Sequence, residues 1–342
     1  MSLTKPGSPP DGSIAEPVAP GTWRVKFQAD ATFGGSTNAY LIEADEGLAL
    51  IDAGIPGERS IARLDDALDE LDATTADVSR ILLTHGHWDH CGLVPTLRAR
   101  HDTPVALHDA DLAIVQRGHI SSAQWDADWD RWLDELGAPA EPRPELLRRA
   151  HQMRGDAIDV APDHRITADF RSALREGEVE TILTPGHSAG HVVFVDRARG
   201  ILFAGDHVLP AINPNVSCLP GSEPDPLTSY LDSLSAVREL DVTVALPGHG
   251  DPFSDLSGRV DELRAARERR LTAVTSLVAE GRPSTAWELA QRYSWRVSWA
   301  EMNAITQLGA LGEIYAHLTC LRTAGRLDRD AAGLYRATGV EA

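Results

Sequence analysis

The residues best suited to chemistry form one short segment, Thr84–His90, which reads Thr-His-Gly-His-Trp-Asp-His. Three imidazoles and one carboxylate in it can bind a transition metal: His85, His87, Asp89 and His90. Neutral imidazole is the commonest metal ligand in proteins, and a carboxylate often completes such a site. Because four such groups would be poorly accommodated this close together without a cation, the segment predicts a metal site rather than a solvated polar loop.

The segment Thr84–His90 can form a metal site only if strands place it beside further ligands from other parts of the chain. Residues 78–83 form a short apolar run, typical of a buried strand that ends in a loop, and residues 92–100 have the pattern of a helix. The segment therefore lies at a strand-to-helix junction, where α/β folds place their chemistry. Three later strand-like runs also end in a histidine or an aspartate: His187, Asp206 and His249. Strand ends that meet at one edge of a sheet would gather all these side chains.

Bulk composition limits the classes of function. With 342 residues, the chain is long enough for one large α/β domain and a smaller appendage. Its formal net charge is −19, and an acidic surface repels nucleic acid and anionic membranes. No apolar run is long enough to span a membrane. The composition favours small-molecule chemistry in the cytoplasm, and a nucleic-acid partner or a membrane is not expected.

The N-terminal residues and the cysteines agree with that location. Residues 1–21 are rich in Pro, Gly and Ser and have no apolar core segment, so we predict a flexible leader rather than an export signal. Cys91, Cys218 and Cys320 are widely spaced and odd in number, which favours reduced thiols over a disulfide framework. We expect Cys91, directly after the metal-binding segment, to be a packed thiol.

Residues 109–169 interrupt the alternation of strands and helices and predict a helical insertion. Trp125, Trp129 and Trp132 follow one another at spacings of four and three, which places them on one helix face. The simpler hypothesis is that this stripe packs the insertion onto the main domain. The alternative is a lid over the metal site, with the three tryptophans shaping an apolar substrate pocket.

The composition changes again at residue 256. Residues 260–278, 284–292 and 305–323 have helical periodicity, and the chain ends in a short predicted hairpin. Three helices and a hairpin suggest a winged-helix-like module over residues 256–342. Its 12 arginines and 10 acidic residues give a charge of +2, which is too small for nucleic-acid binding by electrostatics alone. The module offers apolar surface for a homodimer or for closure of the pocket.

Taken in order, five pieces of the chain resemble the metallo-β-lactamase fold superfamily. They are Asp52 in Ile-Asp-Ala-Gly, the segment Thr84–His90, His187 in Pro-Gly-His-Ser-Ala-Gly-His, Asp206 in Ala-Gly-Asp, and His249 in Pro-Gly-His-Gly. The resemblance covers residues 22–255 and implies an α/β (α+β) fold. Specifically, it implies a four-layer αββα sandwich with the metal site at one edge.

The resemblance also implies a role for each residue. His85, His87 and His187 would bind a first metal ion, while Asp89, His90 and His249 would bind a second, and Asp206 would bridge both. Asp89 would also act in catalysis by orienting the nucleophile, a hydroxide shared by two ions ~3.5–4 Å apart. Two residues are expected to support the ligands from behind: Asp52 and His207. Zinc is the expected metal, with iron and manganese as alternatives.

Three functions remain open from the sequence. The favoured one is a dinuclear metal-dependent hydrolase that acts on the carbonyl of a small thioester, ester or lactone. Antibiotic hydrolysis is disfavoured, because Asp206 occupies a position where the true β-lactamases of the superfamily lack a carboxylate. The alternatives are a phosphodiesterase or endoribonuclease for single-stranded RNA, suggested by the C-terminal module, and a mono-iron dioxygenase.

Overall fold

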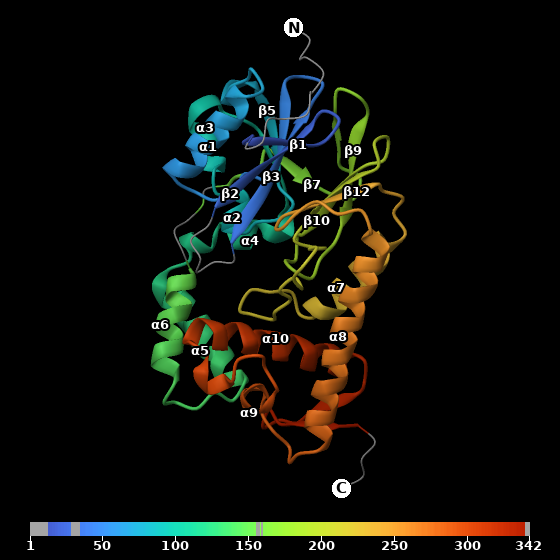
Figure 1. The fold of residues 1–342 in the computed structure, drawn as a ribbon. Coiled ribbons are helices and arrows are strands. Elements are labelled where there is room, and N and C mark those ends of the chain that lie inside the picture. The colour runs from blue at the N-terminus through green and yellow to red at the C-terminus, as the bar shows by residue number, and fades with distance from the viewer. Residues whose placement is uncertain (1–12, 29–34, 155–157, 159, 339–342) are drawn as a thin grey trace.

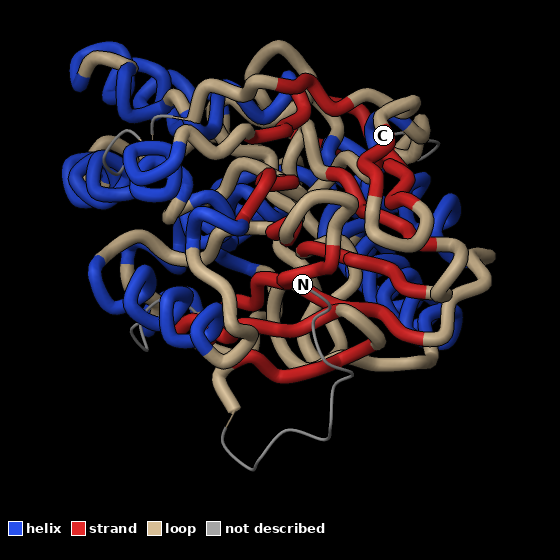
Figure 2. The backbone as a smooth tube through the Cα atoms, turned by 90° about the horizontal axis from the view of Figure 1, so that it is seen from above, coloured by secondary structure: helices blue, strands red, loops and turns tan. Residues whose placement is uncertain are grey.

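A computed structural model of the protein describes residues 13–28, 35–154, 158 and 160–338. Two β-sheets pack face to face, and helices cover their outer faces (Figures 1 and 2). The first sheet has seven strands in sequential order: β1 (Ala15–Ala19), β2 (Thr22–Gln28), β3 (Ser36–Glu43), β4 (Leu48–Ile51), β5 (Val78–Leu82), β6 (Val105–His108) and β7 (His164–Ile166). Strands β1 to β4 pair antiparallel, and β4 to β7 pair parallel.

The second sheet has five strands, which also lie side by side in sequential order. They are β12 (Val244–Pro247), β11 (Ile201–Gly205), β10 (Val192–Asp196), β9 (Glu178–Leu183) and β8 (Arg171–Ala173). Only β11 and β12 pair parallel in this sheet, and the helix α7 (Pro226–Arg238) connects them. A parallel pair needs such a crossover connection. The antiparallel strands follow one another through turns or, between β9 and β10, through the loop of residues 184–191.

Alternation along the strands creates the layers, because successive side chains point to opposite faces of a sheet. In β10, Phe194 faces the first sheet, and Val193 and Val195 face the outer helices. In β3, Tyr40 and Ile42 likewise fill the space between the sheets. The predicted four-layer αββα sandwich is confirmed.

Helices α1 (Glu58–Asp69) and α3 (Val94–His101) cover the first sheet, and α7 covers the second. Helix α1 shows why the sequence folds this way. Its buried residues Ile61, Leu64 and Leu68 recur at helical spacing and join the core beneath the sheet. The remaining short helices of the sandwich are α2 (Trp88–Cys91) and α4 (Leu112–Val115).

The insertion and the C-terminal residues form one helical layer (Figure 1). Its elements are α5 (Ser122–Glu135), α6 (Arg143–Met153), α8 (Leu256–Ala279), α9 (Ala286–Arg292), α10 (Ala304–Thr323) and the hairpin of β13 (Leu327–Arg329) and β14 (Tyr335–Ala337). The amide of Trp287 in α9 donates to the Leu136 carbonyl at the end of α5 (2.9 Å). Tyr315 of α10 donates to Glu135 Oε1 (2.6 Å). The insertion therefore packs against the C-terminal helices as well as the sandwich.

Two sequence-based boundaries are wrong. The predicted leader, 1–21, contains β1, whose edge pairing with β2 includes Pro17 opposite Trp23; residues 1–12 lie outside the described residues. The predicted insertion, 109–169, contains β7, which extends the first sheet beyond β6. No helix of the described part combines the length and the apolar character that a membrane span requires.

Arginines of α8 hold the segment 208–222 that follows β11. Arg259 Nε donates to the Leu209 carbonyl (2.7 Å), and Arg267 donates to the Pro214 carbonyl. Arg267 is buried, stacks over the Tyr230 ring (5.5 Å to its centroid) and pairs with Glu313 of α10 (2.9 Å). The C-terminal helices thus fix the course of a segment that belongs to the sandwich.

We expect Arg267→Met to lower the free energy of unfolding by about 3 kcal/mol, because the change leaves a buried carbonyl without a donor and weakens a buried ion pair. Denaturant unfolding followed by circular dichroism would measure it. Arg269→Met is the matched control, since Arg269 is exposed on the same helix, and its effect should stay within about 0.5 kcal/mol. Equal stabilities for the two variants would contradict the role of Arg267.

Candidate metal centre

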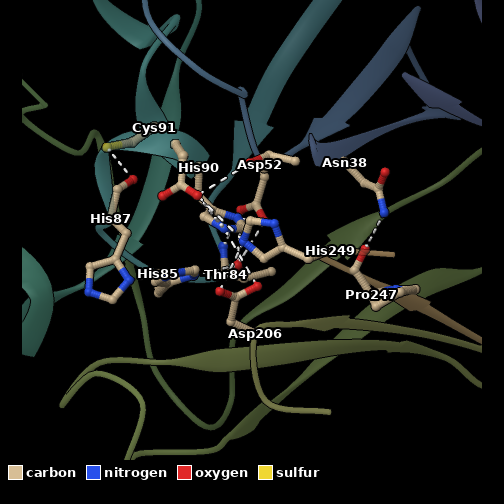
Figure 3. A network of polar contacts seen from close by, with 12 residues as sticks. Asn38, Asp52, Thr84, His85, His87, His90, Cys91, Asp206, Pro247 and His249 are labelled. Carbon is tan, nitrogen blue, oxygen red and sulfur yellow. Dashed lines mark hydrogen bonds and ion pairs between the residues drawn. The ribbon is translucent and has the colours of Figure 1, made fainter. Parts of the chain in front are cut away.

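The parallel strand pairs explain why distant residues meet at one edge. Neighbours β4 and β5 end together, which places Asp52 beside Thr84 and the segment after it. Neighbours β11 and β12 also end together, with Gly205 opposite Pro247, so that Asp206 lies near His249. Figure 3 shows the side chains from these ends pointing toward one another.

All seven residues expected to bind metal come together. They fall into three groups whose candidate ligand atoms lie within 4.8 Å of one another: His85, His87 and His187; His85, His90 and Asp206; Asp89, His90 and His249. In the first group, His87 Nδ1 lies 2.9 Å from His85 Nε2 and 2.9 Å from His187 Nε2. Three imidazole nitrogens converging on one point form the arrangement of a catalytic zinc site, which has three protein ligands and one open position.

Asp206 lies between the two halves of the cluster. Its Oδ2 is 3.5 Å from His187 Nε2 in the first group and 3.3 Å from His249 Nε2. On the other side, Asp89 Oδ2 is 3.4 Å from His249 Nε2 and 3.7 Å from His90 Nε2. One carboxylate oxygen therefore faces nitrogens from both groups, which is the position of a bridging ligand.

Hydrogen bonds behind the ligands select which nitrogen each ring presents. His90 Nδ1 donates to Asp52 Oδ2 (2.8 Å), so Nε2 faces the cluster. His85 Nδ1 lies 3.0 Å from the Thr84 hydroxyl, which in turn donates to Asp52 (2.8 Å to Oδ2). Such outer contacts fix the tautomer and orientation of metal-binding histidines. The expected supporting role of Asp52 matches these contacts, and its left-handed φ of 56° is a conformation that Asp tolerates better than most residues.

Backbone carbonyls orient the rings of His187 and His249, the two histidines that follow later strands. His187 Nδ1 donates to the Asn215 carbonyl (2.8 Å), and His249 Nδ1 donates to the Ser36 carbonyl (2.9 Å). Both rings therefore present Nε2. Asn215 directly follows Pro214, whose carbonyl binds Arg267, so the C-terminal helices support the orientation of His187.

Sequence reasoning missed Asp111, which ties two ligand-bearing loops together. Its Oδ2 accepts from the Gly86 amide (2.8 Å) and the Ser188 hydroxyl (2.7 Å), and its Oδ1 accepts from the Gly190 amide (2.6 Å). Burial raises the pKa of Asp111, although these three donors act in the opposite direction. The buried acceptor holds the loop of His87 against the loop of His187. No local pattern distinguishes Asp111 from the exposed acidic residues around it.

His191 was also missed as a positioning residue, although it closes the quoted Pro-Gly-His-Ser-Ala-Gly-His motif. Its Nε2 accepts from the Asp206 amide (3.1 Å), and its Nδ1 lies 2.8 Å from the Thr184 hydroxyl. Burial, followed by the nearby histidines, lowers the pKa of His191 well below its ordinary value, so the ring is neutral. It fixes the backbone from which the Asp206 carboxylate projects.

The other predicted supporting and neighbouring residues lie behind the cluster. His207 packs against Tyr230 and His191, and among the described residues no hydrogen bond joins it to a proposed ligand, so its supporting role stays a prediction. Burial lowers the pKa of His207 to about 3. Cys91 is buried, and its thiol donates to the His87 carbonyl (3.1 Å), as expected for a packed thiol.

A cavity of about 190 Å³ lies beside His87 and His187. Trp125 and Trp129 line it, whereas Trp132 does not, so the prediction of a pocket role is wrong for Trp132 in this cavity. Trp132 instead donates from Nε1 to the Cys218 carbonyl (3.1 Å). All three tryptophans are buried in the core shared with the C-terminal helices, which matches the simpler packing hypothesis for the stripe.

The charges of the cluster fit bound cations. Among the described residues, His90 Nε2 and Asp206 Oδ1 lie 3.6 Å apart and are buried without a hydrogen-bond partner, which is costly for polar atoms. Burial opposes ionisation, yet the surrounding histidines, His90 foremost, lower the pKa of Asp89 and Asp206, so both remain anionic. Two carboxylates and five imidazoles therefore present the donor set that zinc and similar divalent metals prefer.

We expect metal uptake to release about two protons near neutral pH, because a ligand imidazole must be deprotonated. Burial acts to lower the pKa of His90 and His249, but neighbouring carboxylates outweigh it and raise the pKa of His90 to about 9 and of His249 to about 11. Both rings are thus protonated in the metal-free protein below these values, and metal affinity rises with pH. Titration calorimetry in buffers of different ionisation enthalpy would count the protons, and His249→Ala should release about one fewer. A binding enthalpy that is independent of the buffer would contradict this.

Gly248 must lack a side chain, because a Cβ there would lie 2.3 Å from Asp206 Oδ1 and 2.7 Å from His90 Cε1. We expect Gly248→Ala to weaken metal binding by roughly 10–100-fold, because the added methyl group would displace Asp206 or His90, and disturbed ligand positioning typically has an effect of that size. Metal analysis after dialysis against buffered zinc would measure it. Gly309→Ala is the control, since a Cβ at Gly309 meets nothing within 4 Å. Equal metal retention by both variants would show that the Gly248 contact can relax.

Comparison with known proteins agrees with this geometry. Residues 32–249 match the family model described as the metallo-beta-lactamase superfamily. The probable metallo-hydrolase YqjP of Bacillus subtilis is 26% identical over 307 residues, which cover 86% of this chain and 87% of that protein. The lactamase-like protein aptB of Emericella nidulans is 26% identical over 247 residues, covering 72% of this chain and 61% of that protein.

Two solved structures share the arrangement over nearly the whole chain. A metallo-beta-lactamase family protein from Thermus thermophilus has a TM-score of 0.77 and 27% identity, covering 93% of this chain and 98% of that one. A beta-lactamase domain protein from Burkholderia ambifaria has a TM-score of 0.78 and 27% identity, covering 94% and 93%. With a family match over more than half of its residues, the chain belongs to the metallo-beta-lactamase superfamily and is a metal-dependent hydrolase.

Proposed function

We propose that this chain hydrolyses a small thioester, ester or lactone at a pair of divalent ions, with zinc as the expected metal. The observation that carries the proposal is the position of Asp206 Oδ2, which faces His187 Nε2 at 3.5 Å and His249 Nε2 at 3.3 Å. A carboxylate that serves two groups of imidazoles suits two ions better than one. A single-ion dioxygenase would leave the Asp89, His90 and His249 group without a function.

Each half of the cluster would hold one ion. His85, His87 and His187 would bind the first, Asp89, His90 and His249 the second, and Asp206 both. Bound there, the ions would supply a hydroxide nucleophile near neutral pH and polarise the carbonyl under attack. The chain's own contribution is orientation: Asp52, Thr84 and the carbonyls of Asn215 and Ser36 hold the rings so that no reorganisation is needed.

Asp89 would orient the nucleophile. Its carboxylate is partly accessible, with 15% of the side chain exposed, whereas the His90 ring is fully buried. Its Oδ2 accepts a hydrogen bond from the Thr37 hydroxyl (3.2 Å), which holds the carboxylate toward the cluster. An anionic carboxylate in this place would accept a hydrogen bond from the hydroxide and keep a lone pair of the hydroxide oxygen aimed at the carbonyl carbon.

The cavity supports a small acyl substrate over RNA. It adjoins His87 and His187 and is walled by Trp125, Trp129 and Met153, which suit an apolar acyl chain. A volume of about 190 Å³ holds only a small molecule. The net charge of −19 acts against a polyanion, so a small-molecule partner fits better than a nucleic acid.

The direct test is a panel of acyl thioesters, esters and lactones assayed with protein reconstituted separately with zinc, manganese and iron. We expect turnover of at least one acyl class and two ions per chain. Asp206→Asn should keep the fold and lose the second ion, with kcat lowered by roughly 100-fold or more, because one bridging carboxylate orders both halves.

Two outcomes would overturn the proposal. One is a fully loaded protein that hydrolyses no acyl compound but cleaves labelled single-stranded RNA in a manner lost in Asp89→Ala. The other is protein that purifies from unsupplemented medium with a single iron per chain and gains nothing from added zinc.

A further inference from the structure

The cavity beside the metal centre contains an arginine that the proposed chemistry does not use. Arg117 lies in its wall together with His87 and His187. The lining also includes one acidic residue among the described residues, Glu223. Within the described ranges of the chain, neither Arg117 nor Glu223 forms an ion pair. Charged groups in a confined, largely apolar space are usually paired, so an unpaired arginine there requires an explanation.

Among the described residues, one hydrogen bond positions the Arg117 guanidinium. Its Nε donates to the Ile114 carbonyl (3.1 Å), which fixes the plane of the guanidinium at the end of α4. The two Nη groups have no partner in the described part of the chain. Arginine presents two parallel N–H groups that match a carboxylate, and a pre-oriented guanidinium loses little freedom when it binds one.

The electrostatics are consistent with an unneutralised cation near the metal centre. Burial lowers the pKa of Arg117, and the weaker influences of Cys91 and Asp111 act in the opposite direction. Glu223 does not neutralise Arg117: its Oε2 accepts from the Ser229 hydroxyl (2.6 Å), and its Oε1 is buried without a partner.

The positive charge of Arg117 contrasts with the negative charge of the whole protein. With a net charge of −19, the molecule as a whole repels anions. A local arginine inside the cavity is the feature that would attract a negatively charged group to the metal centre. Since Arg117 lines one cavity with His87 and His187, an anion bound to Arg117 would place an attached acyl group beside the proposed ions.

We propose that Arg117 binds a carboxylate of the substrate, so that the hydrolase acts on acyl thioesters, esters or lactones that carry a second, negatively charged end. Trp125 and Trp129 line the same cavity and contact the apolar part between the carboxylate and the scissile bond. The inference rests on the proposed function, which supplies the reaction, and adds the class of substrate.

The test compares two thioesters of equal chain length, one with a terminal carboxylate and one with a methyl group in its place. We expect the wild-type protein to favour the carboxylate by roughly 10–100-fold in kcat/KM, the range of a charge-assisted hydrogen bond. Arg117→Met should abolish the preference, and Arg117→Lys should keep part of it, since the charge remains without the planar pair of donors.

Arg131→Met is the matched control. Arg131 is exposed (72% of its side chain), lies on α5 and is not part of this cavity, so its removal changes the overall charge equally but should leave the preference intact. Melting temperature and metal content of all variants show whether each one folds and loads. If the preference for the carboxylate thioester fell equally in Arg131→Met and Arg117→Met, it would depend on the overall charge of the protein alone. That result would overturn the proposal.

A binding measurement separates this proposal from the proposed function. Non-hydrolysable thioethers with and without the carboxylate are titrated calorimetrically into the metal-loaded wild type and Arg117→Met. Arg117-dependent binding of the carboxylate form without turnover of either thioester would refute the hydrolysis and retain the anion site. Turnover of both thioesters at equal rates, with equal binding of both thioethers, would retain the hydrolase and refute the role of Arg117.

Discussion

The structure depends on the need to neutralise two carboxylates, the buried Asp206 and the partly buried Asp89. Asp89 and Asp206 lie among imidazoles at a sheet edge, and isolated charges in such a place cost far more than their packing returns. Protons on His90 and His249 meet this need in the metal-free protein, and divalent ions would meet it when bound. The surrounding contacts are consistent with this requirement, because Asp52, Thr84 and two backbone carbonyls each orient a ring toward the carboxylates.

The orientation of His187 links the metal centre to the far end of the chain. Its Nδ1 is held by the Asn215 carbonyl, and the adjacent Pro214 carbonyl is held by Arg267 of α8. The C-terminal helices therefore act on the centre through a segment that contains no proposed ligand. The C-terminal module, residues 256–342, therefore helps to hold the His187 ring in place. This structural role explains the module without nucleic-acid binding.

The four-layer sandwich followed from the resemblance of the motifs to the superfamily, and the convergence of the seven residues followed from histidines and aspartates placed at the ends of strand-like runs. The sequence did not reveal short elements, or residues whose contacts lie far away along the chain. Strands β1 and β7 have five and three residues, too few for a clear period, and β1 includes Pro17. Asp111 and Arg117 lie in a segment without strand pattern, and only the folded chain shows one joining two loops and the other entering a cavity.

The two hypotheses for the tryptophan stripe are not true alternatives. Trp125 and Trp129 are both buried in the core shared with the C-terminal helices and present in the cavity wall, so one face of α5 packs the layer while its edge shapes the space beside His87. The packed rings of Trp125 and Trp129 make the cavity wall rigid. Because such a wall does not adjust to a ligand, the polar groups that bind the substrate must be oriented before it arrives. The fixed guanidinium of Arg117 meets that condition, because its Nε bond to Ile114 orients it before any ligand arrives. Selectivity in such a cavity would come from one charged contact, with the apolar wall contributing affinity but little discrimination among acyl chains.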